Sequence, residues 1–270
     1  MDNALASVFL ERQPENLFSF WYPKVKNCGI LCPRSCVIKA PTMDGPDALF
    51  AKQLFTAWFM ENPEKDSAVI RSRVKREVLP VLETEKLTGH IFVKNGTFSN
   101  KFSARGACNI YGIEKLPDAI AEINYAALCL GAGGAGEIVV REFIEHNAHT
   151  TPSIYEGLPL RPEFRVFYDF DNRKPVFTWN YWDPDYVLKS LHDITDRIIF
   201  EHERDNLENF FHMNRSVVQD MVASAMQNVH GMSGSWSIDI MWDELSKQFW
   251  LIDMARAENS TYWENKSEGV

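Results

Sequence analysis

Two lysines flank a short polar loop in a pattern that suits phosphate binding. Lys94 ends the apolar stretch HIFVK, the loop NGTFSN follows, and Lys101 comes directly after the loop. Backbone N–H groups of a loop rich in Gly, Ser and Thr bind anions, and two ammonium groups add positive charge. This arrangement predicts a triphosphate site. An ordinary exposed hairpin is the competing interpretation, because loops of this composition are common.

Two aspartates lie in the stretch that we expect to form the last hairpin. Asp239 alternates with the tryptophans and isoleucines of SWSIDIMW, so it should face away from the apolar side. DELSKQ is turn-like and FWLIDMA is the expected partner strand, which brings Asp253 to the same face. With Glu258 and Asn259 close by, these hard oxygen ligands suit Mg²⁺. Solvated hairpin acids are the alternative.

Arg165 lies in the middle of the expected strand EFRVFYD, among apolar neighbours. A guanidinium on the polar face of a core sheet usually needs an anion. That anion is either a ligand or a carboxylate of the chain itself, such as Glu163. The sequence leaves both interpretations open.

Several other motifs lack the spacing or the neighbouring elements that their function requires. GAGGAG, residues 131–136, matches a dinucleotide-binding loop, but an expected helix precedes it and an expected strand follows it, the reverse of the required order. We therefore expect a connector that touches no cofactor. Cys28, Cys32 and Cys36 have no zinc-pair spacing and are expected to be reduced. The histidines show no metal spacing, and Ser233 and Ser235 form no nucleophile motif.

The composition limits the classes of protein. The chain has 270 residues, 45% of them hydrophobic, which is enough for one large domain or two or three small lobes. A formal net charge of −9 argues against generic nucleic-acid binding. No apolar run reaches the length of a membrane span, and the first residues have no signal-peptide layout. We expect no membrane association and a cytoplasmic protein.

The expected elements position these residues. Short strands and turns are expected over residues 20–41. Helical spacing occurs at 47–62, at 64–87 and at 116–130, and Pro80 should disturb the second of these helices. Two or three further helices are expected before the last hairpin. The clearest is at 216–231, where Gly231 should end the helix. Strand patterns occur at 90–94, 137–146, in a hairpin over 162–183, and in the last hairpin over 234–259.

In this order, the elements resemble the ATP-grasp superfamily, most closely its clade with one arginine and two lysines in the nucleotide site. FVKNGTFSNKFSARG is similar to the clade's strand with two lysines, and VVREFIE to the linker strand that holds adenine. EFRVFYD looks like the strand that bears the arginine, and SIDIMWD with FWLIDMARAEN like the metal-binding hairpin. The resemblance implies an α+β fold, with two α+β lobes clasping a nucleotide. It also implies a small N-terminal lobe over 1–62, a small subdomain over 63–137 and a large one over 138–270.

The resemblance also implies roles for residues, with ATP and Mg²⁺ as cofactors. Phosphate contacts are implied for Lys94, Lys101 and Arg165, of which Lys101 and Arg165 would also act in catalysis, with Arg165 facing the γ-phosphate or an acyl phosphate. The nucleoside contacts are implied for the backbone around Phe143 and Ile144 and for Glu142 or Glu145 at the ribose. Metal ligation is implied for Asp239 and Asp253. Ala255 stands where the family pattern has an asparagine, so Asn259 or Glu258 is expected to replace that ligand.

The activity implied by the resemblance is ATP-dependent ligation of a carboxylate to an amine or thiol through an acyl phosphate. The substrate would be a small-molecule or peptide carboxylate. The alternative is an ATP-binding assembly chaperone or interaction protein with a protein partner, because a chaperone that assembles a translation initiation factor shares this fold and PEFRVF resembles it too. Ala255 favours this alternative slightly. A structural domain that binds no nucleotide is the third interpretation.

Overall fold

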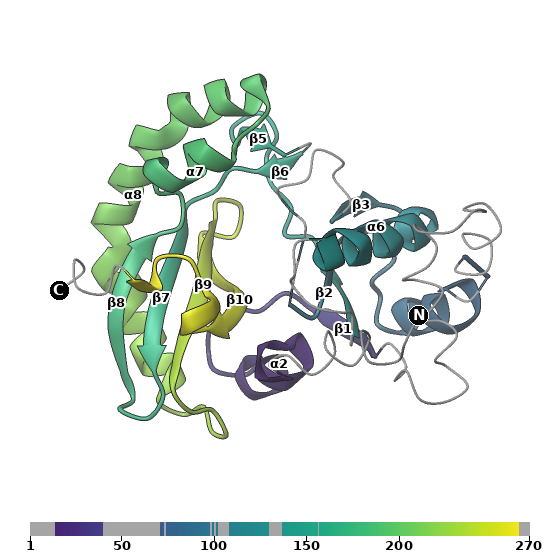
Figure 1. Cartoon of the computed structure of the whole chain (residues 1–270), viewed down its shortest axis with the longest axis horizontal. Coiled ribbons are helices and arrows are strands. Elements are labelled where there is room, and N and C mark those ends of the chain that lie inside the picture. The colour runs from purple at the N-terminus through teal and green to yellow at the C-terminus, as the bar shows by residue number, and fades with distance from the viewer. Residues whose placement is uncertain are drawn as a thin grey trace. The chain divides into compact units, whose positions relative to one another are not determined.

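The computed structural model describes residues 14–39, 71–72, 74–97, 99, 101, 108–129, 137–155 and 157–264 (Figure 1). The chain divides into two compact units. Unit 1 contains Met1–Ser19 and Arg34–Phe143, and unit 2 contains Phe20–Pro33 and Ile144–Val270. The three-part division at residues 62 and 137 stays a prediction. Residues 47–62, expected to be helical, and GAGGAG lie outside the described residues.

Unit 1 contains a four-stranded antiparallel sheet in the order β1-β4-β2-β3. The strands are β1 (Ser35–Lys39), β2 (His90–Asn95), β3 (Asn109–Tyr111) and β4 (Glu137–Glu142). Helix α6 (Leu116–Cys129) contacts β2, and the one-turn helix η3 (Ile113–Lys115) precedes it. The expected strands at 90–94 and 137–146 and the expected helix at 116–130 are thus confirmed, although β4 ends at Glu142.

The helical pattern around Pro80 is interrupted as the sequence predicts. A π-helical turn, η2 (Val74–Val78), runs directly into α5 (Leu79–Thr84), and Pro80 lies in the first turn of α5. A proline cannot donate a backbone hydrogen bond and is tolerated in the first turn of a helix. The chain therefore changes its helical winding just before the proline and begins a new α-helix there.

Unit 2 is built on a second four-stranded antiparallel sheet, in the order β10-β9-β7-β8. The two expected hairpins are confirmed as β7 (Glu163–Asp169) with β8 (Lys174–Asn180), and β9 (Ser235–Asp243) with β10 (Gln248–Arg256). Pairing of β7 with β9 joins the hairpins. A small ribbon of β5 (Ser153–Ile154) and β6 (Leu158–Pro159) precedes them, and η4 (Ala257–Asn259) follows β10.

One face of the unit 2 sheet is apolar and forms a core with helix α8 (Ile194–Met226), which contacts β7 and β8 (Figure 1). Its buried side chains alternate along the strands. They are Phe164, Val166, Tyr168, Trp236, Ile238, Ile240, Leu251 and Met254. Leu207, Phe211, Val218 and Val222 are buried on α8. The opposite face of the sheet carries Arg165, Asp239 and Asp253.

The helices of unit 2 differ from the expectation in extent. After α7 (Pro184–Ser190), the chain forms one continuous helix of 33 residues, and the expected helix at 216–231 is its C-terminal part. The helix begins where Asp193 caps the backbone N–H groups of Thr195 and Asp196. It ends at Met226, so Gly231 does not end it; Gly231 adopts a positive φ in the following turn.

The expectation of strands and turns over 20–41 is wrong in its first part. Residues Phe18–Val25 form helix α2 after the short η1 (Pro14–Asn16), and β1 begins only at Ser35. Pro23 lies inside this helix, where a proline disfavours helix formation. The burial of Phe18, Trp21 and Val25 at helical spacing outweighs that penalty.

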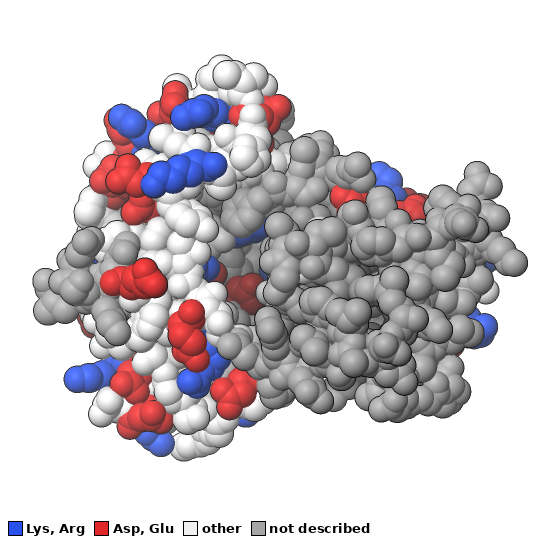
Figure 2. Space-filling view, in the orientation of Figure 1, with Lys and Arg blue, Asp and Glu red and all other residues white. Residues whose placement is uncertain are grey.

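Charge is mixed on the visible surface. Figure 2 shows acidic and basic side chains interspersed on the face of the described residues that it draws. Among the described residues, each helix is either too short or too polar to cross a membrane.

Two neighbouring valines of α8 test the core assignment. Val218 is fully buried, whereas Val217 is 58% exposed. Val218→Ala should lower the free energy of unfolding by about 2 kcal/mol, because it removes buried methyl groups and leaves a cavity. Val217→Ala makes the same chemical change at the surface and should stay within about 0.5 kcal/mol of the wild type. If urea unfolding shows that both variants lose the same free energy of unfolding, the packing assigned to α8 is contradicted.

Candidate functional site

The polar face of the unit 2 sheet carries an ion pair between neighbouring strands, next to a buried aromatic cluster that includes Phe167 and Phe177. Arg165 of β7 and Asp239 of β9 are register partners. Arg165 Nε donates to Asp239 Oδ1 and Nη2 to Oδ2, both at 2.8 Å. The side chains are only 12% and 10% exposed. The anion that Arg165 requires is therefore a carboxylate of the chain, and it is Asp239 rather than Glu163.

Two more groups hold the Arg165 guanidinium. Its carbon lies 4.9 Å from the centre of the Tyr181 ring, and Nη1 lies 3.5 Å from the carbonyl oxygen of Thr261. Burial alone would lower the pKa of Arg165, but the charge and hydrogen bonds of Asp239 raise it more, so the pKa lies well above its usual value. Arg165 is a fixed positive charge at all ordinary pH values.

A register shift in β10 brings Asp253 to the same face. From the turn up to the Leu251–Ile240 pair, β9 and β10 pair one residue against one. The next pair is Asp253 with Asp239, so Ile252 is an extra residue in β10. Without this bulge, Asp253 would pair with Ile238 and point into the apolar core. The predicted proximity of the two aspartates thus depends on a single inserted residue.

The donor set predicted for Mg²⁺ consists of Asp239, Asp253 and Asn259. Carboxylate and amide oxygens are the hard donors that Mg²⁺ prefers, so the chemistry of these residues fits the ion. Asp239 is buried rather than solvated, against the alternative interpretation, while Asn259 is exposed in η4. Within the described ranges no group of three or more His, Cys, Asp and Glu could hold a metal. The predicted set has two carboxylates and an amide, so its role stays a prediction.

Ala255, the residue that differs from the family pattern, has no side-chain atom that could bind a metal. Ala255 is paired with Ser237 across the hairpin. The Ser237 hydroxyl lies 3.4 Å from the Ala255 carbonyl oxygen and 2.5 Å from the Ser260 hydroxyl. The Ser237 and Ser260 hydroxyls thus bind each other close to the Ala255 backbone.

Lys94 lies on β2 of unit 1 and is only 2% exposed. The exposed-hairpin interpretation is therefore wrong for Lys94. Strand alternation and register place Glu137 and Arg141 of β4 on the same face of the sheet, and they are 1% and 8% exposed. Arg141 was missed, although its spacing of four residues from Glu137 in EIVVRE placed both side chains on one face of the expected strand. Its guanidinium carbon lies 4.6 Å from the centre of the Phe92 ring.

The loop after β2 is tightly built where the structure describes it. A Cβ on Gly96 would lie 2.6 Å from Glu137 Oε1, so a larger residue would force a shift. Thr97 N donates to Asn95 Oδ1 at 3.0 Å. Lys101 is half-buried. Burial raises the pKa of the Cys108 thiol to about 12, and the positive charge of Lys101 opposes this rise in part.

The residues predicted to contact the nucleoside have further contacts. Glu142 accepts hydrogen bonds from Arg34 N at 2.8 Å and Arg34 Nε at 2.7 Å, so both of its oxygens are engaged. The Phe143 ring stacks on His90 at 3.7 Å, and the other face of His90 stacks on Tyr111 at the same distance. The nucleoside roles themselves stay predictions. Arg34 and His90 were missed because their contacts join residues far apart in sequence.

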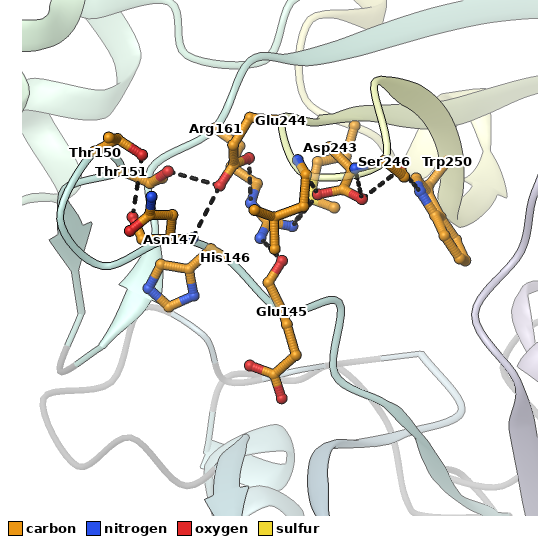
Figure 3. Close-up of polar contacts among 12 residues, drawn as sticks. Glu145, His146, Asn147, Thr150, Thr151, Arg161, Asp243, Glu244, Ser246 and Trp250 are labelled. Carbon is orange, nitrogen blue, oxygen red and sulfur yellow. Dashed lines mark hydrogen bonds and ion pairs between the residues drawn. The ribbon is translucent and has the colours of Figure 1, made fainter.

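A buried network in unit 2 surrounds Arg161, which is 1% exposed (Figure 3). Its Nη2 donates to the backbone carbonyl of Glu145. Nε lies 3.2 Å from Glu244 Oε2, and Nη1 lies 3.9 Å from Asp243 Oδ1. Burial lowers the pKa of Arg161, and the charges of Glu244 and Asp243 offset this only in part.

Glu244 also holds the segment that follows Glu145. Its Oε1 accepts from Thr151 Oγ1 at 2.6 Å and from the backbone N–H of Asn147 at 3.4 Å. A pocket of about 530 Å³ adjoins the network. Its lining includes Asn147, Thr151, Arg161, Phe210, Trp242 and Glu244. The sequence interpretation overlooked this network, because DELSKQ indicated only a turn.

Comparison with known proteins shows similarity only at the level of structure. No family model matches the sequence. No curated protein matches it either. The solved structure of Cdc123 from Schizosaccharomyces pombe is similar at 15% identity with a TM-score of 0.56, over 95% of this chain and 91% of that one.

ATP-grasp enzymes show weaker similarity, with TM-scores too low to support any argument. A RimK domain protein ATP-grasp from Sphaerobacter thermophilus has 8% identity and a TM-score of 0.39 over 94% of this chain and 63% of its own. D-alanine–D-alanine ligase from Bacillus anthracis, solved with ATP, has 8% identity and a TM-score of 0.42 over 94% and 60%.

The predicted α+β fold class is confirmed: both units combine helices with an antiparallel sheet, and the fold is similar to that of Cdc123. At 15% identity, the similarity to Cdc123 concerns the fold alone. Membership of the clade with one arginine and two lysines stays a prediction.

The Arg165–Asp239 ion pair should contribute much more to the free energy of unfolding than an ion pair between exposed side chains. Arg165→Met leaves the Asp239 carboxylate nearly buried without its cation, so the free energy of unfolding should fall by about 3 kcal/mol. The control is Arg197→Met, because Arg197 pairs with Glu201 at side-chain exposures of 48% and 51%. Arg197→Met should lower the free energy of unfolding by less than about 1 kcal/mol.

A double variant separates charge from packing in this test. Asp239→Asn added to Arg165→Met removes the uncompensated charge and should restore part of the lost stability. Urea unfolding would contradict the assignment if Arg165→Met unfolds at the same urea concentration as the wild type.

Proposed function

We propose that this protein binds ATP with Mg²⁺ and joins a carboxylate to an amine or thiol through an acyl phosphate. One observation carries the proposal. The polar face of the unit 2 sheet presents two opposed carboxylates, Asp239 and Asp253, beside a nearly buried guanidinium, Arg165. Such a face offers metal ligands and a phosphate-binding cation on neighbouring strands.

The carboxylates of Asp239 and Asp253, with the Asn259 amide oxygen, would hold the metal. Two carboxylates at opposed positions repel each other, and a dication relieves that repulsion. When bound, Mg²⁺ would neutralise charge on the phosphate oxygens and align them for transfer. Because Asp239 also holds Arg165, the carboxylate would divide its oxygens between the ion and the guanidinium.

The cationic side chains would bind the phosphates. Arg165 would face the γ-phosphate and then the acyl phosphate, Lys94 and Lys101 would contact the phosphate chain, and Lys101 would stabilise charge during transfer. The nucleoside would contact the backbone around Phe143 and Ile144, and Glu142 or Glu145 would bind the ribose. Because Arg34 engages Glu142, the ribose role falls more readily to Glu145, whose side chain is exposed.

The reaction would proceed in two steps. A substrate carboxylate oxygen attacks the γ-phosphorus of ATP, and ADP leaves. An amine or thiol then attacks the acyl carbon, and phosphate leaves. Fixed charges on the protein supply most of the catalysis, so the chain needs no covalent nucleophile. The substrate class proposed is a small-molecule or peptide carboxylate, and the proposed location is the cytoplasm.

The second candidate is an ATP-binding assembly or interaction protein with a protein partner. Ala255 favours it, because the hairpin lacks the amide donor of the family pattern at that position. Such a protein would bind ATP and Mg²⁺ without consuming ATP in the presence of carboxylates and amines. A metabolite extract incubated with the protein and ATP, followed by mass spectrometry, separates the two functions: consumption of ATP with a new ligated product supports the ligase.

The lysines should contribute to ATP affinity. Lys94→Ala and Lys101→Ala should each remove a charge-assisted phosphate contact worth about 1.5–3 kcal/mol, which weakens binding roughly tenfold or more. Lys115→Ala is the surface control, because Lys115 is an exposed lysine of unit 1 outside the proposed site. Titration calorimetry that finds ATP affinity unchanged in both variants would remove these lysines from the site.

The metal hairpin should control turnover. Asp253→Asn should abolish Mg²⁺-dependent phosphate release with little effect on folding, because it removes the negative charge of a metal ligand and keeps the side-chain shape. Asp171→Asn, in the exposed turn of the other hairpin, should have no effect. Asn259→Ala tests whether Asn259 replaces the missing asparagine and should also lower turnover strongly. Unchanged turnover in Asp253→Asn would refute the metal assignment.

A further inference from the structure

We infer that Arg161 and Glu244 are positioning residues that hold the segment 145–151 from inside unit 2 and so fix how Glu145 meets the nucleoside. This inference rests on the proposed function, in which Glu145 binds the ribose. It concerns two residues that would not touch the nucleotide. Their effect would pass through the backbone of Glu145 and Asn147.

The first step is that Arg161 is rigid. Its guanidinium is buried and contacts the Glu145 carbonyl, the Glu244 carboxylate and the Asp243 carboxylate. Its own backbone carbonyl accepts a hydrogen bond from Trp182 Nε1 at 2.6 Å. A buried guanidinium can keep its charge only while such partners surround it, so its position is tightly constrained.

The second step is that Glu244 holds the other end of the segment. Its Oε2 faces Arg161, while its Oε1 accepts from Asn147 N and Thr151 Oγ1. The backbone between these residues is a compact turn, because the Asn147 carbonyl accepts from Thr150 N at 3.0 Å and Thr151 N at 2.8 Å. One ion pair thus anchors the segment at Glu145, at Asn147 and at Thr151.

The third step concerns the direction of Glu145. Its carbonyl oxygen points toward Arg161, while its side chain extends away from the network and is exposed (Figure 3). Fixing the carbonyl therefore fixes where the backbone of Glu145 lies and the direction in which its side chain leaves the backbone. A ligand-binding residue whose backbone is held by a second layer of contacts loses less conformational freedom on binding.

The test separates the nucleoside from the phosphates. Arg161→Lys keeps the charge, but an ammonium cannot bond Glu145 and Glu244 with the planar fork of arginine. Glu244→Gln keeps the shape, but if its carbonyl still faces Thr151, its amide N–H₂ opposes Arg161 Nε–H. Thr151→Val removes only one hydroxyl and is the mildest change. Arg197→Lys and Glu201→Gln make the same substitutions in an exposed pair of unit 2 and serve as controls.

Calorimetry would measure the affinity of each folded variant for ATP and for inorganic tripolyphosphate, both with Mg²⁺. We expect the three network variants to bind ATP more weakly, by about tenfold for Arg161→Lys and Glu244→Gln, and tripolyphosphate as the wild type does. The controls should match the wild type for both ligands. Hydrogen exchange of the 144–151 backbone, without nucleotide, should be faster in Arg161→Lys and Glu244→Gln than in the controls.

The outcomes distinguish this inference from the proposed function. A wild type that binds neither ATP nor tripolyphosphate refutes the proposed function. A wild type that binds ATP, with network variants that bind it equally well or lose both ligands equally, overturns the positioning role. If Arg161→Lys and Glu244→Gln fail to fold, Thr151→Val decides: unchanged ATP affinity together with unchanged exchange at 144–151 rejects the inference.

Discussion

A buried guanidinium must lie against carboxylates, and unit 2 meets this constraint twice within one short stretch. Arg161 and Arg165 stand just before and within β7, and both are largely removed from water. The carboxylates that face them come from β9 and the turn after it, namely Asp239, Asp243 and Glu244. The charge pattern therefore favours β9 as the neighbour of β7, because that pairing gives both arginines carboxylate partners and keeps the apolar side chains on one face.

In the same sheet, a bulge brings the two aspartates of a hairpin to one face. Strict alternation along β9 and β10 would place Asp253 among the core side chains, where a charge is costly. Ile252 shifts the register by one, so Asp253 joins Asp239 and Met254 stays in the core. The sheet retains its apolar face for α8 and gains a second carboxylate on the other face. Bulges are common next to functional sites for this reason.

Local patterns were enough to predict the hairpins, α6 and the polar face with Arg165 and Asp239, because alternation and turn residues act over short distances. Partner choice was not predictable, since Arg165 meets Asp239 only through the pairing of β7 with β9, strands 74 residues apart at this contact. Helix α2 was missed because Pro23 is a strong local signal, and burial outweighed it. The polar first half of α8 concealed the length of that helix.

In the proposed function, nucleotide binding and phosphoryl transfer would place different demands on Arg165. Binding needs a positive charge at a fixed place, and the contacts with Asp239, Tyr181 and Thr261 provide one. Transfer needs that charge to strengthen its contact as negative charge moves onto the leaving and transferred oxygens. Because both oxygens of Asp239 hold the guanidinium, any metal drawn to Asp239 would weaken this grip and release Arg165 toward the phosphate. The ion pair that stabilises the sheet is therefore also the contact that catalysis would have to loosen, and a protein that only binds ATP could keep it intact.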